Sequence, residues 1–199
     1  MLVSALSLLL GQLNQYIQQA DGNALGTVAP TVWGNIAQID HPEIGTDLEN
    51  KLVLTVVNVE EEKTLKNGTN VTRNPSGAIE YKNPPLHLNV VVLFAANYRN
   101  YETALKRLTQ VLSFFQGKQR FTLQNSPGAA VDPMTELSLT MDLLSLSFEE
   151  VNHLWGSLGG KQLPFAAYRA RLVVIDDRRV LDGGGLVREV TVVGRDATA

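Results

Sequence analysis

The side chains best suited to metal binding or acid-base chemistry are the three histidines, His41, His87 and His153. None has a partner at the spacing that zinc or hydrolytic sites use, and the chain contains no cysteine. His153 has Glu149 one helical turn before it, which is typical of a surface pair on a helix. The sequence therefore predicts no metal site.

Other motifs that could support catalysis also lack what the chemistry requires. Glu60, Glu61 and Glu62 end a predicted strand, where neighbouring side chains point to opposite faces. The glycines at 183–185 are not followed by the lysine and helix start of a phosphate loop, so we expect a hinge there. No Gly-x-Ser-x-Gly nucleophile elbow occurs. We therefore expect no catalytic set and no cofactor, and a protein that is not an enzyme.

Length and composition indicate a soluble globular protein. The 199 residues are 44% hydrophobic, which suits one domain over residues 1–199. With 17 basic and 20 acidic residues, the net charge of −3 provides no basic patch for phosphate backbones or anionic lipids. We expect neither nucleic acid nor a membrane as a partner.

Hydrophobic periodicity predicts three helices. Residues 2–17 place leucines at helical spacing, and a helix from residue 101 has Asn100 as its cap and Gly117 at its end. The third helix begins with a capping box of Ser147 and Glu150 and ends at Gly159. The apolar rows expected to face the core are Tyr101, Leu105, Leu108, Leu112 and Phe115 in the second helix and Val151, Leu154, Trp155 and Leu158 in the third.

Strands alternate with these helices. They are predicted at residues 31–36, 52–60, 86–94, 120–124, 136–143, 165–175 and 186–193, and the second is expected to be covered on both faces. Between the second and third strands, residues 61–85 form a polar excursion in which Asn67 and Gly68 could close a projecting hairpin. The fold class is therefore α/β (α+β), a mixed or largely antiparallel sheet flanked by about three helices.

Several blocks of sequence together resemble the tail terminator or cap proteins of extracellular contractile injection systems, the phage-tail-like particles that include the antifeeding-prophage type. The blocks are residues 92–98, 100–105, 114–118, 146–155, 159–164 and 168–173, in the same order. The resemblance extends from the first helix to about Asp177. The core and motif residues that it highlights are Tyr101, Leu105, Phe115, Phe148, Glu150, Leu154, Trp155, Pro164 and Tyr168.

The resemblance implies a tail-terminator fold and a structural role. It implies a homohexameric ring that closes the distal end of the inner tube and sheath, with the sheath and inner tube proteins of the same particle as partners. Such a protein is assembled in the bacterial cytoplasm and becomes part of a particle that can be released.

A ring subunit needs surfaces that meet its neighbours, and the polar excursion and the last strand are our candidates. An exposed strand edge there would let a neighbouring chain add by backbone hydrogen bonds. The interface residues expected on these segments are Lys63, Lys66, Asn67, Asn70, Arg73, Tyr81, Arg178, Arg179, Arg188 and Val190. Two alternatives remain open, a small ligand-binding module or enzyme of unknown substrate and a phage tail-completion protein.

Overall fold

The computed structural model describes residues 2–22, 29–65, 71–73, 78–122, 124–126, 138–175 and 180–184. The helices in these ranges are α1 (Leu2–Ala20), α2 (Ile44–Leu48), α3 (Tyr101–Gly117) and α4 (Phe148–Ser157), with 3-10 turns η1 (Ile36–Gln38) and η2 (Lys63–Leu65). The strands are β1 (Thr31–Trp33), β2 (Lys51–Glu61), β3 (Val71–Arg73), β4 (Ile79–Lys82), β5 (Leu86–Asn97), β6 (Arg120–Thr122), β7 (Ser138–Leu143), β8 (Phe165–Ile175) and β9 (Val180–Gly184).

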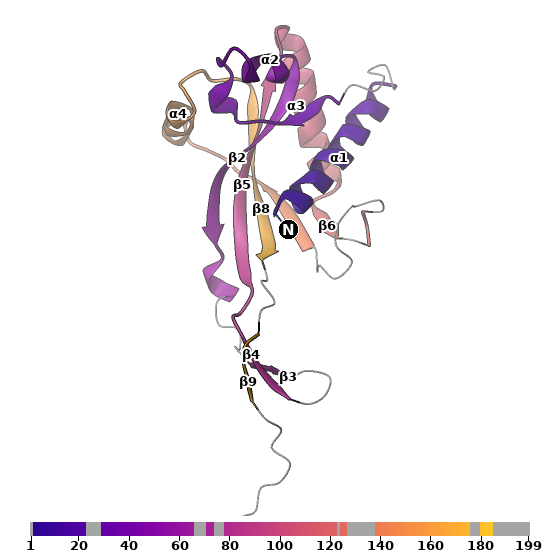
Figure 1. Cartoon of the computed structure of the whole chain (residues 1–199). Coiled ribbons are helices and arrows are strands. Elements are labelled where there is room, and N and C mark those ends of the chain that lie inside the picture. The colour runs from indigo at the N-terminus through magenta and orange to yellow at the C-terminus, as the bar shows by residue number, and fades with distance from the viewer. Residues whose placement is uncertain are drawn as a thin grey trace, which may run out of the picture.

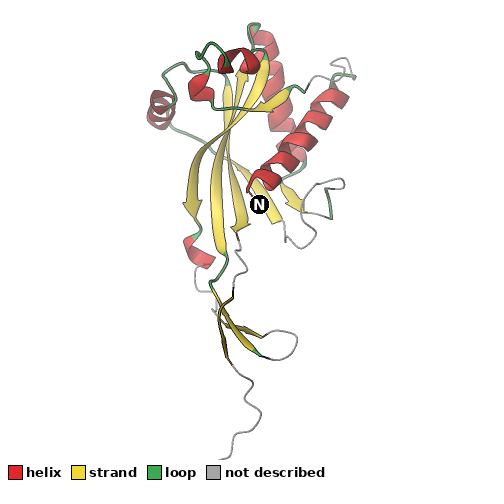
Figure 2. Cartoon of the chain, viewed as in Figure 1, coloured by secondary structure: helices red, strands yellow, loops and turns green. Residues whose placement is uncertain are grey.

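Six of these strands form one curved sheet in the order β1-β2-β5-β8-β7-β6 (Figure 2). The β1–β2 pair is parallel and the other ladders are antiparallel. The predicted fold class, a mixed and largely antiparallel sheet with flanking helices, is confirmed. The three predicted helices are α1, α3 and α4, and the short α2 is an addition.

Helices cover both faces of the upper part of this sheet (Figure 1). On β5, Val92 and Phe94 belong to the core beneath α1 and α3, whereas Leu93 and Ala95 belong to the core beneath α4 and α2. This division follows from the strand geometry, because successive side chains point to opposite faces. The larger core contains a cluster of aromatic rings around Phe115, which packs against Phe94, Phe121 and Tyr168.

The lower part of the sheet extends beyond the helices. β2 is buried on both faces only from Leu52 to Thr55, and a β-bulge interrupts its ladder with β5 between Val56 and Asn58. Val56 and Val59 are exposed. The prediction of a strand covered on both faces is therefore right for its first half and wrong for its second, because no helix among the described residues lies over that half (Figure 1).

A second, three-stranded sheet projects from this lower end in the order β3-β4-β9 (Figure 1). We call it the arm. A projecting hairpin was expected, but residues 74–77 connect its strands β3 and β4, and Asn67 and Gly68 lie outside the described residues. The prediction of a glycine hinge is wrong, because Gly183 and Gly184 pair with β4 as part of β9. The predicted strand 186–193 lies outside the described residues.

Helix α3 begins and ends where the sequence predicts, with the Asn100 side chain accepting the Thr103 backbone N–H at 3.0 Å. Its buried face is different from the predicted one. The buried residues are Ala104, Arg107, Gln110, Val111, Phe114 and Phe115. Of the predicted row only Phe115 is buried and Leu108 partly buried, while Tyr101, Leu105 and Leu112 are exposed.

A buried ionic cluster explains why α3 turns a charged residue inward. The Asp21 carboxylate, at the end of α1, accepts hydrogen bonds from Arg107 and from the Gln110 amide at 3.1 Å, and pairs with Lys106 at 2.8 Å. Burial raises the pKa of Asp21, but the hydrogen bonds from Lys106, Arg107 and Gln110 outweigh it and lower the pKa to about 2. This cluster joins α1 to α3.

Candidate interaction surfaces

The residues considered first for metal or acid-base chemistry do not meet in the structure. Within the described residues, no group of three or more histidine, cysteine, aspartate or glutamate side chains could hold a metal ion. The three histidines lie on separate elements. His41 lies in the turn before α2, where its Nδ1 accepts the Glu43 backbone N–H at 3.4 Å, whereas His87 is on β5 and His153 is exposed on α4.

Glu62 has a structural role at the root of the arm. Its carboxylate accepts hydrogen bonds from the Thr64 hydroxyl at 2.7 Å, from the Thr64 backbone N–H at 3.1 Å and from the Asn89 amide at 2.8 Å. The hydrogen bonds from Thr64 and then Asn89 lower the pKa of Glu62 to about 2, which burial opposes. Glu62 thus links the turn η2, which follows β2, to β5 of the main sheet.

The arm presents both apolar side chains and strand edges to its surroundings. Val71 on β3 lies directly opposite Tyr81 on β4, so the two side chains share one face of the arm, and both are exposed. Among the described strands, β3 and β9 are the outer ones of this sheet. An outer strand has backbone groups that another chain can pair with. The arm is therefore suited to protein contact.

The expected interface residues fall partly on this surface. Tyr81 is exposed on β4, Lys63 is exposed in η2 at the root, and Arg73 belongs to β3. The other expected interface residues lie outside the described residues; they are Lys66, Asn67, Asn70, Arg178, Arg179, Arg188 and Val190.

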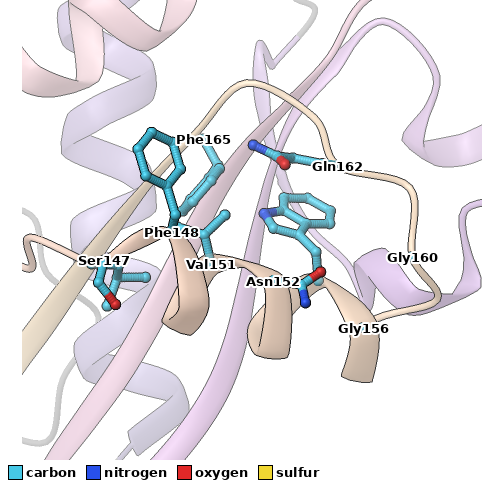
Figure 3. A pocket seen from close by; sticks show the side chains of 10 residues that line it. Ser147, Phe148, Val151, Asn152, Gly156, Gly160, Gln162 and Phe165 are labelled. Carbon is cyan, nitrogen blue, oxygen red and sulfur yellow. The ribbon is translucent and has the colours of Figure 1, made fainter.

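A second surface is a groove beside α4, with a volume of about 490 Å³ (Figure 3). Its apolar lining includes Val151, Trp155 and Phe165, and the rings of Trp155 and Phe165 pack with centroids 5.5 Å apart. Phe148 lines the groove and is 96% exposed. The buried Trp155 Nε1–H has no hydrogen-bond partner among the described residues. The groove can seat an apolar side chain, with Phe148 as an additional contact.

The segment after α4 fixes the position of this groove. The helix ends at Ser157 and is followed, after Leu158, by Gly159 and Gly160, whose φ angles of 100° and 81° favour glycine. The chain then returns to the sheet, where the Pro164 carbonyl accepts the Ala96 backbone N–H at 2.8 Å. Phe165 starts β8 directly afterwards. The groove is therefore built by one continuous stretch of sequence.

Of the motif residues highlighted by the resemblance, some are buried and others are exposed. Phe115, Trp155 and Tyr168 are buried core residues, as expected. Leu154 is partly buried, and Glu150 is exposed and completes the capping box. Tyr101 and Leu105 are exposed, so their assignment to the core is wrong, and the motif residue Phe148 is exposed as well. Spacing along a helix could not reveal this, since Phe148 lies three residues before Val151 and seven before Trp155.

The capping box makes a testable contribution to the α4 groove. The Ser147 hydroxyl accepts the Glu150 backbone N–H at 3.3 Å, and the Glu150 carboxylate accepts the Ser147 backbone N–H at 2.7 Å. We expect Ser147→Ala to lower the free energy of unfolding, measured in urea, by about 1 kcal/mol. Ser157→Ala, at the other end of α4, is the control and should cost under about 0.5 kcal/mol. Equal losses of unfolding free energy in the two variants would show that the capping box adds nothing to the stability of the chain.

No helix in the described part of the chain combines the length and the apolar character needed to span a bilayer.

The fold of the chain is similar to the folds of known proteins of contractile injection systems. One similar structure is the sheath/tube terminator of the PVC extracellular contractile injection system in its extended state, with a TM-score of 0.56 and 13% sequence identity. The match covers 94% of this chain and 63% of that one. Another is the tube-terminating cap of the anti-feeding prophage, with a TM-score of 0.51 and 13% identity, covering 72% of this chain and 49% of that one.

A comparison with curated proteins found no match. A family model does match, over residues 5–189, and its description is Pvc16 N-terminal domain. The chain belongs to this family. The resemblance to contractile-injection-system terminators that the sequence suggested is thereby confirmed. The chain spans about three fifths and one half of the length of the two terminators.

Proposed function

We propose that this chain is a structural cap that terminates the inner tube and sheath of a contractile injection system. It acts as a self-associated hexameric ring, without catalysis, and its partners are further copies of itself and the sheath and tube proteins of the same particle. The family match and the fold support this proposal. In this function the chain is assembled in the bacterial cytoplasm, needs neither nucleic acid nor a membrane, and leaves the cell with the particle.

The observation that carries the proposal is the arm. None of the arm side chains that the structure describes is buried, and the arm carries the exposed pair Val71 and Tyr81 and two outer strands. Such a surface contributes little to the stability of one isolated chain. It becomes useful when a neighbouring chain covers the apolar pair or adds a strand at an edge. We assign the arm to contacts with neighbouring ring subunits, sheath or tube.

The test compares an arm variant with a matched variant of the main body. Native mass spectrometry at several concentrations reports self-association, and co-sedimentation with purified tube and sheath reports capping. Val71→Ser combined with Tyr81→Ser should leave the thermal unfolding unchanged within about 2 °C and abolish co-sedimentation. The control is Val59→Ser, which removes an exposed apolar side chain from β2 and should leave capping intact.

Two outcomes would contradict different parts of the proposal. Full capping by the double variant would show that the arm is not the contact surface. A wild-type chain that stays monomeric at high concentration and binds neither tube nor sheath would contradict the cap function itself.

A second candidate function, a small ligand-binding module, is favoured by one observation. The α4 groove has a volume within the range of about 300 to 1,000 Å³ that is common for small-molecule sites. The same mass spectra distinguish the two functions. A ligand-binding module would be a monomer that retains a small molecule from the expression host, and Val151→Arg would remove that added mass.

A further inference from the structure

Helix α3 carries a second apolar row that the fold leaves open. Tyr101, Leu105, Leu108 and Leu112 follow one another at steps of four, three and four residues. Tyr101 is 66% exposed, Leu105 43% and Leu112 37%, while Leu108 is partly buried. We call these four residues the α3 row. This spacing keeps the side chains on one side of a helix, and it is the spacing by which helices pack against other helices.

The α3 row lies on the flank of α3 that faces away from α1. Arg107 and Gln110 on α3 reach Asp21 at the end of α1, which fixes the side on which α1 lies. At 100° per residue, Leu108 and Leu112 are about 160° around the helix from Gln110. The α3 row is therefore not occupied by α1 of the same chain.

One strand of the main sheet carries another exposed apolar residue, on the face that α1 and α3 cover. On β7, Leu139 and Met141 point into the core beneath α1 and α3, so Leu143, two residues further, points to the same face. Leu143 is exposed, and it pairs with Tyr168, whose ring packs on Phe115 of α3. Leu143 is therefore a further exposed apolar side chain on the sheet face that α3 covers, and exposed apolar side chains of this size occur at protein contact surfaces.

The outward face of α1 has the properties expected of a partner for this row. The helix contains no charged residue over its 19 positions. Its exposed residues are Val3, Ser7, Gly11, Gln15 and Gln19, which recur every four positions, and the terminal Ala20; Val3 is 71% exposed. Surface helices are usually charged on their outer side, whereas charged residues are depleted at the centre of protein interfaces. The absence of charge on both faces makes them electrostatically compatible.

Gly11 adds an independent indication that something approaches this face. A glycine inside a helix is less stable than alanine, and a Cβ at position 11 would meet no atom of the described residues within 4 Å, apart from the backbone of α1 itself. No contact among the described residues therefore explains the glycine. A glycine leaves a depression in the helix surface, into which a large side chain of a second helix can fit.

We propose that the α3 row of one copy packs against the outward face of α1, from Val3 to Gln15, of the next copy. The inference rests on the proposed function, because it requires self-association, and it names the surfaces that self-association uses. The two surfaces are different parts of the same chain, so the contact is heterologous. Heterologous contacts repeat from copy to copy and close into a ring when the rotation permits.

The first part of the test changes each surface separately. Leu105→Lys with Leu112→Lys places two charges in the α3 row, while Thr109→Lys with Ser113→Lys places the same charges on a neighbouring exposed stripe of the same helix. Gly11→Leu fills the depression on α1 and, with open space around it, should leave the thermal midpoint equal or higher. We expect the α3-row variant and Gly11→Leu to raise the apparent dissociation constant about tenfold or more. The control should match the wild type.

The second part mixes the two defective variants. The chain with Gly11→Leu keeps an intact α3 row, and the α3-row variant keeps an intact α1 face, so one good contact can form between them. Native mass spectrometry should show a one-to-one heterodimer in the mixture and predominantly monomers in each variant alone. Misfolding cannot produce this pattern.

The outcomes separate this inference from the cap function. The proposed contact between the α3 row and α1 is wrong if the wild type self-associates and both variants do so equally well. It is also wrong if the wild type self-associates and the mixture gives no heterodimer. In both cases self-association itself is retained. If the wild type itself stays monomeric at high concentration, the self-association on which the contact depends is wrong, and the contact falls with it.

Discussion

Replacing Phe115 by alanine is expected to lower the free energy of unfolding by about 4 kcal/mol. The ring is 2% exposed and touches four other aromatic rings, Phe94, Phe114, Phe121 and Tyr168, at centroid distances from 4.6 to 6.1 Å. Alanine would leave a cavity among rings that belong to α3, β5, β6 and β8 and cannot all move into it. Urea unfolding monitored by circular dichroism measures the loss.

The chain provides a matched control for this prediction. Phe148→Ala removes the same atoms from a side chain that is 96% exposed, and it should change the free energy of unfolding by under about 0.5 kcal/mol. A comparable loss in both variants would mean that the aromatic cluster around Phe115 is not packed as described. Because Phe148 lines the α4 groove, the same variant can also be assayed for partner binding.

The second large effect is expected at the buried cluster of Asp21, Lys106, Arg107 and Gln110. Asp21→Ala should lower the free energy of unfolding by about 3 kcal/mol, because it leaves the buried Arg107 guanidinium without its carboxylate partner. Lys106 also pairs with Asp21, but its side chain is 59% exposed, so Lys106→Ala should cost under about 1 kcal/mol. Equal losses in the two variants would contradict the assignment of Arg107 as the buried partner.

The pH dependence of this cluster follows from the lowered pKa of Asp21. The carboxyl has a pKa of about 2 in the folded chain against 3.8 ordinarily, so its contribution is complete above the ordinary value and is lost as the pH falls through about 2. The wild type should exceed Asp21→Asn in stability by about 2 kcal/mol at neutral pH. The difference should narrow between about pH 5 and pH 2. A difference that stays constant down to pH 2 would exclude this linkage.

Local signals in the sequence were sufficient for most elements. The caps at Asn100 and Ser147, the glycines after α4 and the alternation in β8 depend on neighbouring residues, and the structure places α3, α4 and β8 where these signals predict. Such features could be predicted because their physical causes lie within one or two turns of the chain.

The incorrect predictions involve contacts between distant residues. Which row of α3 faces inward depends on Asp21, 86 residues before Arg107, and the apolar spacing of Tyr101, Leu105, Leu108 and Leu112 gives no information about that partner. Gly183 and Gly184 have low strand propensity, and they form a strand because β4 offers backbone partners. For the candidate surfaces, Tyr81 on the polar excursion could be predicted as an interface residue. The exposure of Phe148 beside the α4 groove could not be predicted from the sequence.

The order of strands in the arm determines when its strands can pair while the chain is being synthesised. β3 and β4 are near neighbours in the chain, whereas β9 follows β4 by about 100 residues, so the arm has only two strands until β9 has been made. During that interval the edge of β4 is open to any strand of suitable register. A β9 segment from another copy can pair there only where its local concentration rivals that of the tethered β9 of the same chain. Translation rate and local concentration would then decide how many subunits emerge with exchanged arms.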